Sequence, residues 1–322
     1  MKMYEELIDH ACRAEELGFG SFWVTEHHFW YDGYCPSLLP VLAGLARRTS
    51  RIKLGTGAFL LPLHDPLRVA EDAAVVDNLS HGRLMLGIGI GYRPEEFDGL
   101  GTEKRTRGER VVEGITVVQK ALSEDSFSHH GKHYQYENVH VVPKPLQQPH
   151  PPIWFAGGTA IVSAERAGRH GLAYWHGPAT TLEMVSACRE AYFKGAKAGG
   201  VARESLKMAV MRDVCVARTQ EEAERYMRED LIPQYEEQLV GFGFILDEAG
   251  NPLRKLPREH PFYRRLLDSF VVGTPEKVTR ELKKYQALGI DVVMPRIFPA
   301  FFRNERILAE MELFATEVMP HF

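Results

Sequence analysis

The sequence has few cysteines, no long apolar run and little excess charge of one sign. Its four cysteines show no CxxC spacing, which is typical of free thiols in a reducing compartment rather than of a disulfide framework. No apolar run approaches the roughly 20 residues of a membrane span. The first residues form an acidic helical pattern, not a basic segment followed by an apolar one. These absences predict a cytoplasmic protein that is not embedded in a membrane.

The formal net charge is only -4, and the charged residues are interspersed. This distribution argues against nucleic acid or an anionic membrane surface as the main partner. The chain has 322 residues, of which 44% are apolar and 25% charged, as in ordinary globular proteins. Because no Pro/Ser-rich linker or change of composition divides it, we expect a single domain over residues 1–322.

Helix-like and strand-like segments alternate along the whole chain. Strict alternation predicts parallel strands joined by crossover helices, and at this length a (β/α)8 TIM barrel. The count gives seven strands rather than eight, and the missing one would have to precede Tyr4. We therefore expect that the chain starts late or that another segment fills the gap. The strand-like runs are residues 19–25, 51–61, 83–90, 153–156, 172–175, 207–216 and 291–297.

Two stretches depart from this alternation. Residues 126–145 contain turn signals and a short strand-like run at 139–142, which indicates an exposed hairpin. Its histidines, at positions 129, 130 and 133, have no carboxylate or fourth ligand spaced to complete a zinc site, so we predict no metal. Residues 232–270 lack a clean period and contain several glycines, prolines and aromatics. Such a segment predicts an insertion that acts as a lid or binding loop.

The stretch FGSFWVTEHH, residues 19–28, combines a buried strand with three titratable residues at its end. In a parallel barrel, the ends of successive strands collect at one face, where Glu26, His27 and His28 could carry chemistry. The alternative is that Glu26 caps a loop and both histidines are structural. Strand parity places His27 and His28 on opposite sides, without deciding which of them faces inward.

Glycines mark two further strand regions. Gly55 and Gly57 interrupt the run 51–61, which indicates a bulge or a close backbone approach. Gly157 and Gly158 lie between a strand and a helix, followed by Thr159. Free amides at a helix N-terminus attract anions, so this turn could hold a phosphate. The alternative is that the two glycines only make the turn.

The chain resembles the bacterial-luciferase-like, flavin-dependent monooxygenases. The resemblance rests on an ordered set of pieces: ELGFGSFWVTEHHF, IKLGTGAFLLPLHDPLRVAEDAAVVDNLSHGRLMLGIGIGYRPEEFDGLG, PPIWFAGGT, VGTPEKV and LFATEVMPHF. It implies that FMN lies at the C-terminal mouth of the barrel. It also implies that His27 is the catalytic histidine that assists proton transfer, a task suited to imidazole. Glu26 could orient either histidine or form a structural ion pair.

The same resemblance assigns further residues to the cofactor. Gly57 and Ala58 match the place of a non-proline cis peptide behind the flavin ring, and residues 157–159 match the phosphate-binding segment. Where luciferase itself has an arginine for the phosphate, this chain has Ile90, and Arg93 is the candidate substitute. The helical runs 36–48 and 66–79 match the dimer interface of the family, which implies a homodimer.

Three functions follow from these observations. The leading hypothesis is a monooxygenase that uses O2 and reduced FMN, supplied by a separate flavin reductase, on a small organic substrate. Its candidate pocket walls, which could equally be ordinary core, are Phe29, Trp30, Tyr92 and Trp175. The second is a deazaflavin-dependent hydride transferase, which the EHH sequence disfavours. The third is a flavin-binding subunit without turnover, which the presence of Glu26 and His27 disfavours.

Overall fold

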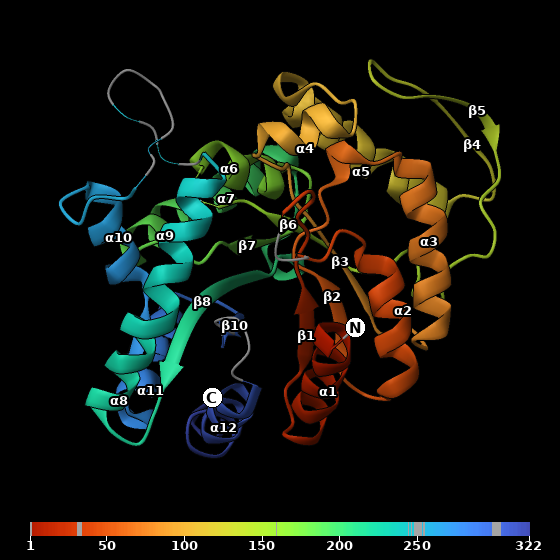
Figure 1. The fold of residues 1–322 in the computed structure, drawn as a ribbon. Coiled ribbons are helices and arrows are strands. Elements are labelled where there is room, and N and C mark those ends of the chain that lie inside the picture. Colours follow the sequence, from red (N-terminus) through yellow and green to blue (C-terminus); the bar gives the residue numbers. More distant parts are fainter. Residues whose placement is uncertain are drawn as a thin grey trace. The chain divides into compact units, whose positions relative to one another are not determined.

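The computed structural model describes residues 2–30, 34–158, 160–243, 245, 247, 253, 255–297 and 304–322 (Figure 1). Its backbone divides into two compact units, Met1–Ala156 and Gly157–Phe322, which we describe separately. In both units, parallel strands alternate with helices, as the sequence predicts. The single domain over residues 1–322 stays a prediction.

Unit 1 is built on four parallel strands in the order β1-β2-β3-β6 (Figure 1). All residues of β3 are buried, as expected of a parallel strand covered on both faces. Helix α3 packs against α2 and α5. The strands are β1 (Ser21–Val24), β2 (Lys53–Thr56), β3 (Leu84–Ile88) and β6 (Ile153–Ala156), and the longer helices are α1 (Lys2–Glu16), α2 (Leu38–Arg48), α3 (Pro66–Leu79) and α5 (Arg107–Ser123).

The end of β2 differs from the sequence prediction. The strand predicted over residues 51–61 is too long, because the regular ladder ends at Thr56. A cis peptide bond joins Gly57 to Ala58, and a 3-10 helix follows at Leu61–Leu63. The predicted close approach at Gly55 is confirmed: a Cβ there would lie 2.2 Å from the ring of Trp23, its partner on β1.

The predicted hairpin of unit 1 is confirmed, with a shifted second strand. Strands β4 (Phe127–His130) and β5 (Gln135–Val139) pair in antiparallel orientation (Figure 1). The strand predicted over residues 139–142 is therefore wrong apart from its first residue. Val142 is 77% exposed and precedes a proline, which donates no ladder hydrogen bond, so pairing does not continue there.

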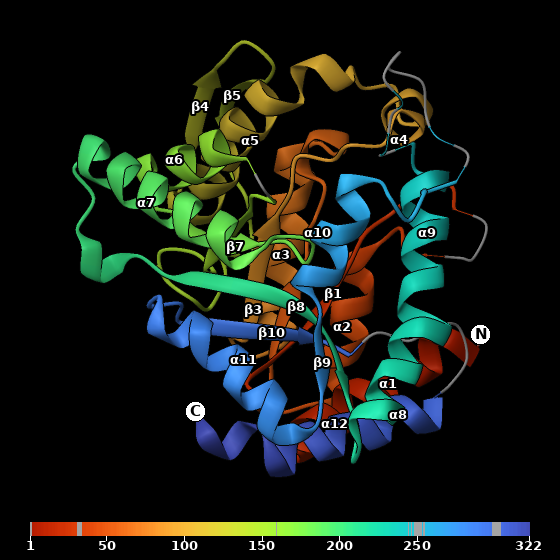
Figure 2. The ribbon, with the colours of Figure 1, turned by 90° about the vertical axis from the view of Figure 1, so that its left-hand side faces the viewer.

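Unit 2 contains three parallel strands in the order β7-β8-β10, with the short β9 paired to the end of β8 (Figure 2). The sequence did not predict β9, which has three residues directly before the helix start at Thr274. The strands are β7 (Ala173–His176), β8 (Met208–Val216), β9 (Val271–Gly273) and β10 (Val292–Arg296), and the main helices are α6 (Ile161–Arg169), α7 (Leu182–Gly199), α11 (Pro275–Ala287) and α12 (Asn304–Glu317).

Helices α6 and α7 of unit 2 approach one another closely because glycines line their contact. A Cβ on Gly168 would lie 1.9 Å from the carbonyl oxygen of Tyr192, and one on Gly195 would lie 1.9 Å from that of Glu165. Real Cβ atoms do not come so near to a backbone oxygen. The two helix backbones are therefore in direct contact, which holds α6 and the turn before it in place.

The segment predicted as irregular, residues 232–270, contains two helices among its described residues. Helix α9 covers Ile232–Gly241 and α10 covers Pro261–Ser269, and the irregular prediction is wrong for both. Their aromatic and aliphatic side chains join one buried cluster with β8 and β9, and this tertiary packing outweighs the weak sequence period. The middle of the segment lies partly outside the described residues, and its role as a lid stays a prediction.

Among the helices of the described ranges, none is long and apolar enough to cross a membrane.

Candidate active site

The residues that follow β1 form a buried, hydrogen-bonded centre in unit 1. Glu26, His27 and His28 are 3%, 9% and 8% exposed. The backbone N–H of His27 donates to the carbonyl oxygen of Cys35 (3.2 Å), which fixes the chain as it leaves the strand. The side chains of His27 and His28 have different carboxylate partners. Both residues lie beyond β1, which ends at Val24, so the opposite facing expected from strand parity stays a prediction.

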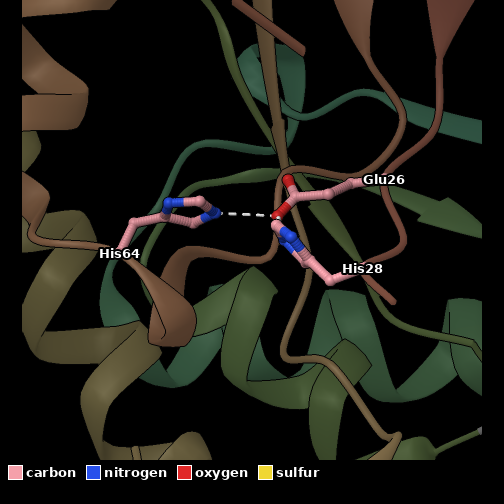
Figure 3. Close-up of side chains that lie close together, drawn as sticks. All are labelled: Glu26, His28 and His64. Carbon is pink, nitrogen blue, oxygen red and sulfur yellow. Dashed lines mark hydrogen bonds and ion pairs between the residues drawn. The ribbon is translucent and has the colours of Figure 1, made fainter. Parts of the chain in front are cut away.

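Glu26 joins two histidines through one oxygen. Its Oε1 lies 2.8 Å from Nε2 of His28 and 2.7 Å from Nε2 of His64, which follows the 3-10 helix after β2 (Figure 3). Its Oε2 accepts the backbone N–H of Leu60 (3.1 Å). Burial by itself would raise the pKa of the Glu26 carboxyl, but the hydrogen bonds from His28, His64 and Leu60 outweigh burial and lower it. A carboxylate only accepts, so both imidazoles donate from Nε2.

These three side chains are also the group, within the described part of the chain, that could surround a metal ion. The separations decide how to interpret them. Ligand atoms about 2.0–2.2 Å from a tetrahedral zinc lie roughly 3.3–3.6 Å from one another. The two oxygen–nitrogen distances at Glu26, 2.7 and 2.8 Å, are shorter and have the length of hydrogen bonds. The cluster is therefore a carboxylate shared by two imidazole donors.

His27 has a carboxylate partner of its own, Glu96. This residue belongs to α4 (Pro94–Gly99) and is fully buried. Its Oε1 lies 2.8 Å from Nδ1 of His27 and accepts the backbone N–H of His28 (3.0 Å). Arg93 donates from Nη1 to the same oxygen (3.3 Å) and to the carbonyl oxygen of His28 (2.6 Å). Glu96 thus connects α4 to the end of β1.

Aromatic side chains enclose the other side of His27. Its Nε2 lies 3.1 Å from the hydroxyl of Tyr92, which is 37% exposed. The rings of Tyr34 and Tyr92 meet the imidazole edge-on, with centroid distances of 4.8 and 5.5 Å. Tyr34 is itself held by Thr25, whose hydroxyl is 2.5 Å from the phenol oxygen. One nitrogen of His27 is therefore buried against a carboxylate, and the other faces a half-exposed phenol.

The predicted cofactor residues fall in both units. In unit 1, the Gly57–Ala58 bond is cis, as the family resemblance implies. The guanidinium of Arg93 is buried, contacts Glu96 and lies 5.2 Å from the ring centroid of Trp30. It is thus engaged in the His27 cluster, and its predicted role toward a phosphate stays a prediction.

In unit 2, Gly157 and Gly158 form the turn between β6 and α6, and Thr159 lies outside the described residues. Gly158 has φ 56°, and a Cβ there would meet nothing within 4 Å. Helix α6 begins after Ala160, and the side chains described around its start provide no cap for its first amides. An open glycine before an uncapped helix start fits an anionic group such as a phosphate.

Unit 2 also contains buried polar residues that the sequence analysis missed. On β8, Asp213 accepts from the hydroxyl of Tyr235 (2.5 Å) and pairs with Arg296. At the end of β7, His176 is fully buried, and neither ring nitrogen has a hydrogen-bond partner among the residues that the structure describes. Burial first, and then the charge of Arg212, lower the pKa of His176 to about 3, so it is neutral at physiological pH.

Sequence reasoning also missed Glu96, His64 and Tyr34 in unit 1. A signal for α4 was present, because Pro94 followed by two acidic residues is typical of a helix start. No local pattern could connect Glu96 to His27, since 69 residues separate them. Of the predicted aromatic walls in unit 1, Tyr92 contacts His27, and Phe29 is 62% exposed. Trp175, in unit 2, is buried.

Parallel strands that alternate with helices, with imidazole–carboxylate pairs at a strand end, define an α/β enzyme. The family model described as luciferase-like monooxygenase matches residues 2–292. The chain therefore belongs to the luciferase-like monooxygenase family.

The chain is similar to several curated proteins. The chain is 28% identical to the oxygenase component of the flavin-dependent trigonelline monooxygenase from Acinetobacter baylyi, over 100% of this chain and 90% of that protein. It is 26% identical to an FMNH2-dependent dimethylsulfone monooxygenase from Pseudomonas putida, over 83% and 74% of the two chains. An F420-dependent glucose-6-phosphate dehydrogenase from Amycolatopsis mediterranei is 32% identical, over 52% of this chain and 51% of that protein.

Among solved structures, the monooxygenase RslO1 from Streptomyces bottropensis superposes with a TM-score of 0.86 and 27% identity, over 99% of this chain and 93% of that one. The predictions of the family, of a luciferase-like TIM-barrel fold class and of an oxidoreductase are thus confirmed. The FMNH2-dependent relative supports FMN as the predicted cofactor. The F420-dependent relative supports the alternative, a deazaflavin coenzyme.

Proposed function

We propose that this protein is the oxygenase of a two-component system, which receives reduced FMN from a separate flavin reductase and oxygenates a small organic molecule with O2. The observation that carries this proposal is His27, whose Nδ1 is held by Glu96 and whose Nε2 faces the half-exposed Tyr92. The relative named as an oxygenase component and the one named as FMNH2-dependent support the same reaction.

In this proposal, bound FMN in its reduced form supplies the electrons that activate O2. His27 holds and returns a proton at Nε2, the nitrogen that faces Tyr92 rather than Glu96. The hydrogen bonds described for Glu26 go to residues other than His27. Glu26 instead fixes His28, His64 and the backbone of Leu60, and so the chain that follows the cis bond at Gly57–Ala58. The role of Glu26 is thus to orient the chain around the proposed binding site of the flavin ring.

The glycine turn predicted to hold the phosphate of the cofactor belongs to unit 2. The turn at Gly157, Gly158 and Thr159 holds the phosphate, supported by the open glycine and the uncapped start of α6. Tyr92 and Trp30 exclude water from His27, since Tyr92 contacts its imidazole and Trp30 lies against Arg93.

We further propose a cytoplasmic homodimer that pairs through α2 and α3. Helix α3 carries two exposed apolar side chains, Val75 (43% exposed) and Leu79 (38%), which support an interface on that helix. Sedimentation velocity on the purified chain tests this, with a species near twice 36.5 kDa expected.

The second candidate is hydride transfer with a deazaflavin coenzyme, which the F420-dependent relative favours. A titration distinguishes the two. The protein is titrated with FMN and with the deazaflavin coenzyme, each oxidised and reduced, and the quenching of tryptophan fluorescence is followed. Tight binding of reduced FMN alone supports the oxygenase. Preference for the deazaflavin supports hydride transfer, and binding of neither contradicts both enzyme functions.

A further inference from the structure

We propose that Glu96 is the positioning residue for His27: it holds the imidazole in the Nδ1–H tautomer and so makes Nε2 the nitrogen that exchanges a proton at the reaction centre. This inference deepens the proposed oxygenase function and rests on it for the identity of the reaction. The tautomer itself is a property of the chain without cofactor.

The hydrogen bonds at Glu96 Oε1 define the tautomer. Two of the three groups that reach this oxygen can only donate: the backbone N–H of His28 (3.0 Å) and Nη1 of Arg93 (3.3 Å). An oxygen that already accepts two hydrogen bonds does not carry a proton for a third contact. Nδ1 of His27, at 2.8 Å, must therefore bear the hydrogen. In a neutral imidazole this leaves Nε2 as the acceptor.

The opposite nitrogen lies where proton transfer is possible. Nε2 of His27 is 3.1 Å from the hydroxyl of Tyr92, so the phenol donates to it in the resting protein. Tyr92 is 37% exposed, whereas Glu96 is fully buried. The accessible side of the imidazole is thus Nε2, and a reacting group that displaces the phenol meets an unprotonated nitrogen.

The fold holds Glu96 firmly enough for this task. Its neighbour Phe97 is fully buried in a cluster with Leu60 and Leu63. The ring of Phe97 also lies so near Gly91 that a Cβ there would be 3.0 Å away. Helix α4 is therefore anchored through Phe97, directly beside Glu96, and the carboxylate cannot move without disturbing this packing.

The other buried carboxylate of the site cannot replace it. Glu26 Oε1 is already shared by Nε2 of His28 and Nε2 of His64, and its Oε2 accepts from Leu60. Glu26 thus binds the imidazoles of His28 and His64, whereas Glu96 binds the imidazole of His27. Of the two roles that the sequence left open for Glu26, its contacts support the orientation of an imidazole, at His28 and His64.

A cofactor-free measurement tests the tautomer directly. Protein labelled with 15N histidine is examined by long-range 1H–15N NMR, and the His27 signal is identified by its loss in the His27→Asn variant. We expect wild-type His27 to be protonated at Nδ1, and Glu96→Gln to give a mixture of tautomers. Glu95→Gln, a change at the adjacent, half-exposed carboxylate, should leave the tautomer unchanged. Wild-type His27 protonated at Nε2 would overturn the inference.

A kinetic measurement tests whether the tautomer matters to the reaction. The probe is reduced FMN mixed with O2, with the oxidation of the flavin followed in a single turnover. The carboxylates that orient metal-bound histidines give a scale for this effect, since their mutation typically costs about 10–100-fold in affinity or activity. We therefore expect Glu96→Gln to change the rate by about tenfold and Glu96→Ala by more, with the Kd for reduced FMN within about twofold of wild type.

Glu95→Gln is the matched control and should match wild type. Equal rates for Glu96→Gln and Glu95→Gln would contradict the positioning role. If wild type does not bind reduced FMN, the proposed function fails, and the NMR result still decides the role of Glu96.

Discussion

Replacing Glu26 by alanine removes the acceptor shared by His28, His64 and the backbone N–H of Leu60. A buried donor left without a partner costs about 1–3 kcal/mol. The His64 side chain is 27% exposed and can rebind water, so two donors, on His28 and Leu60, stay unpaired. Their sum is about 2–6 kcal/mol. The substitution also removes the cost of burying the carboxylate charge, which offsets part of this sum. We therefore expect a loss of about 3 kcal/mol in the free energy of unfolding.

Urea unfolding of wild type and Glu26→Ala measures this loss. The control is Glu16→Ala on α1, whose side chain is 64% exposed and whose ion pair with Arg13 is worth little. A loss at Glu26 below about 0.5 kcal/mol, no larger than at an exposed ion pair, would refute the reasoning.

The pH dependence gives a second test of the same residue. The pKa of Glu26 is lowered in the folded state from its ordinary value of 4.5, so the unfolded chain binds the proton more readily. The stabilisation by Glu26 is therefore fully present above pH 4.5 and is lost as the pH falls through the folded-state pKa. The difference in stability between wild type and Glu26→Gln should shrink over that acid range. A stability difference that does not change with pH would show that the carboxylate charge of Glu26 does not cause the stabilisation.

Two further predictions concern the packing and the strand connections. Gly195→Ala places a methyl group 1.9 Å from the carbonyl oxygen of Glu165 and should destabilise unit 2 by about 2–3 kcal/mol in thermal unfolding, whereas Gly44→Ala, with open space around it, should not destabilise the protein. Glu15→Ala removes the acceptor for the backbone N–H groups of residues 50–52 and should cost about 1 kcal/mol. Burial would raise the pKa of Glu15, but these hydrogen bonds lower it to about 2. The extra stability of wild type over Glu15→Ala should therefore be lost as the pH falls from 4.5 to about 2.

The sequence was sufficient to predict those elements whose structure is determined by their own local pattern. The alternation of helix-like and strand-like segments predicted seven of the parallel strands described in the two units, though not β9, and the helical run predicted over residues 66–79 is α3. Gly55 predicted the close approach that Trp23 makes. These features depend on neighbours in the chain or on a single glycine.

The features that the sequence did not predict depend on contacts between residues far apart in the chain. The separation of His27 from His28 is set by Glu96 on one side and by Glu26 with His64 on the other. No local pattern reveals such partners. Likewise, α9 and α10 form because their side chains complete a core cluster with β8 and β9, although residues 232–270 lack a clear helical period.

The most direct test of the account is the reaction of the reduced FMN complex with O2 in a stopped-flow instrument. The account predicts that bound reduced FMN is oxidised at a rate at least about tenfold different from that of free reduced FMN, and that His27→Asn changes this rate. His140→Asn, at an exposed histidine of the hairpin, should match wild type. A time course identical to that of free reduced FMN, or a His27→Asn variant that behaves as wild type, would contradict the account.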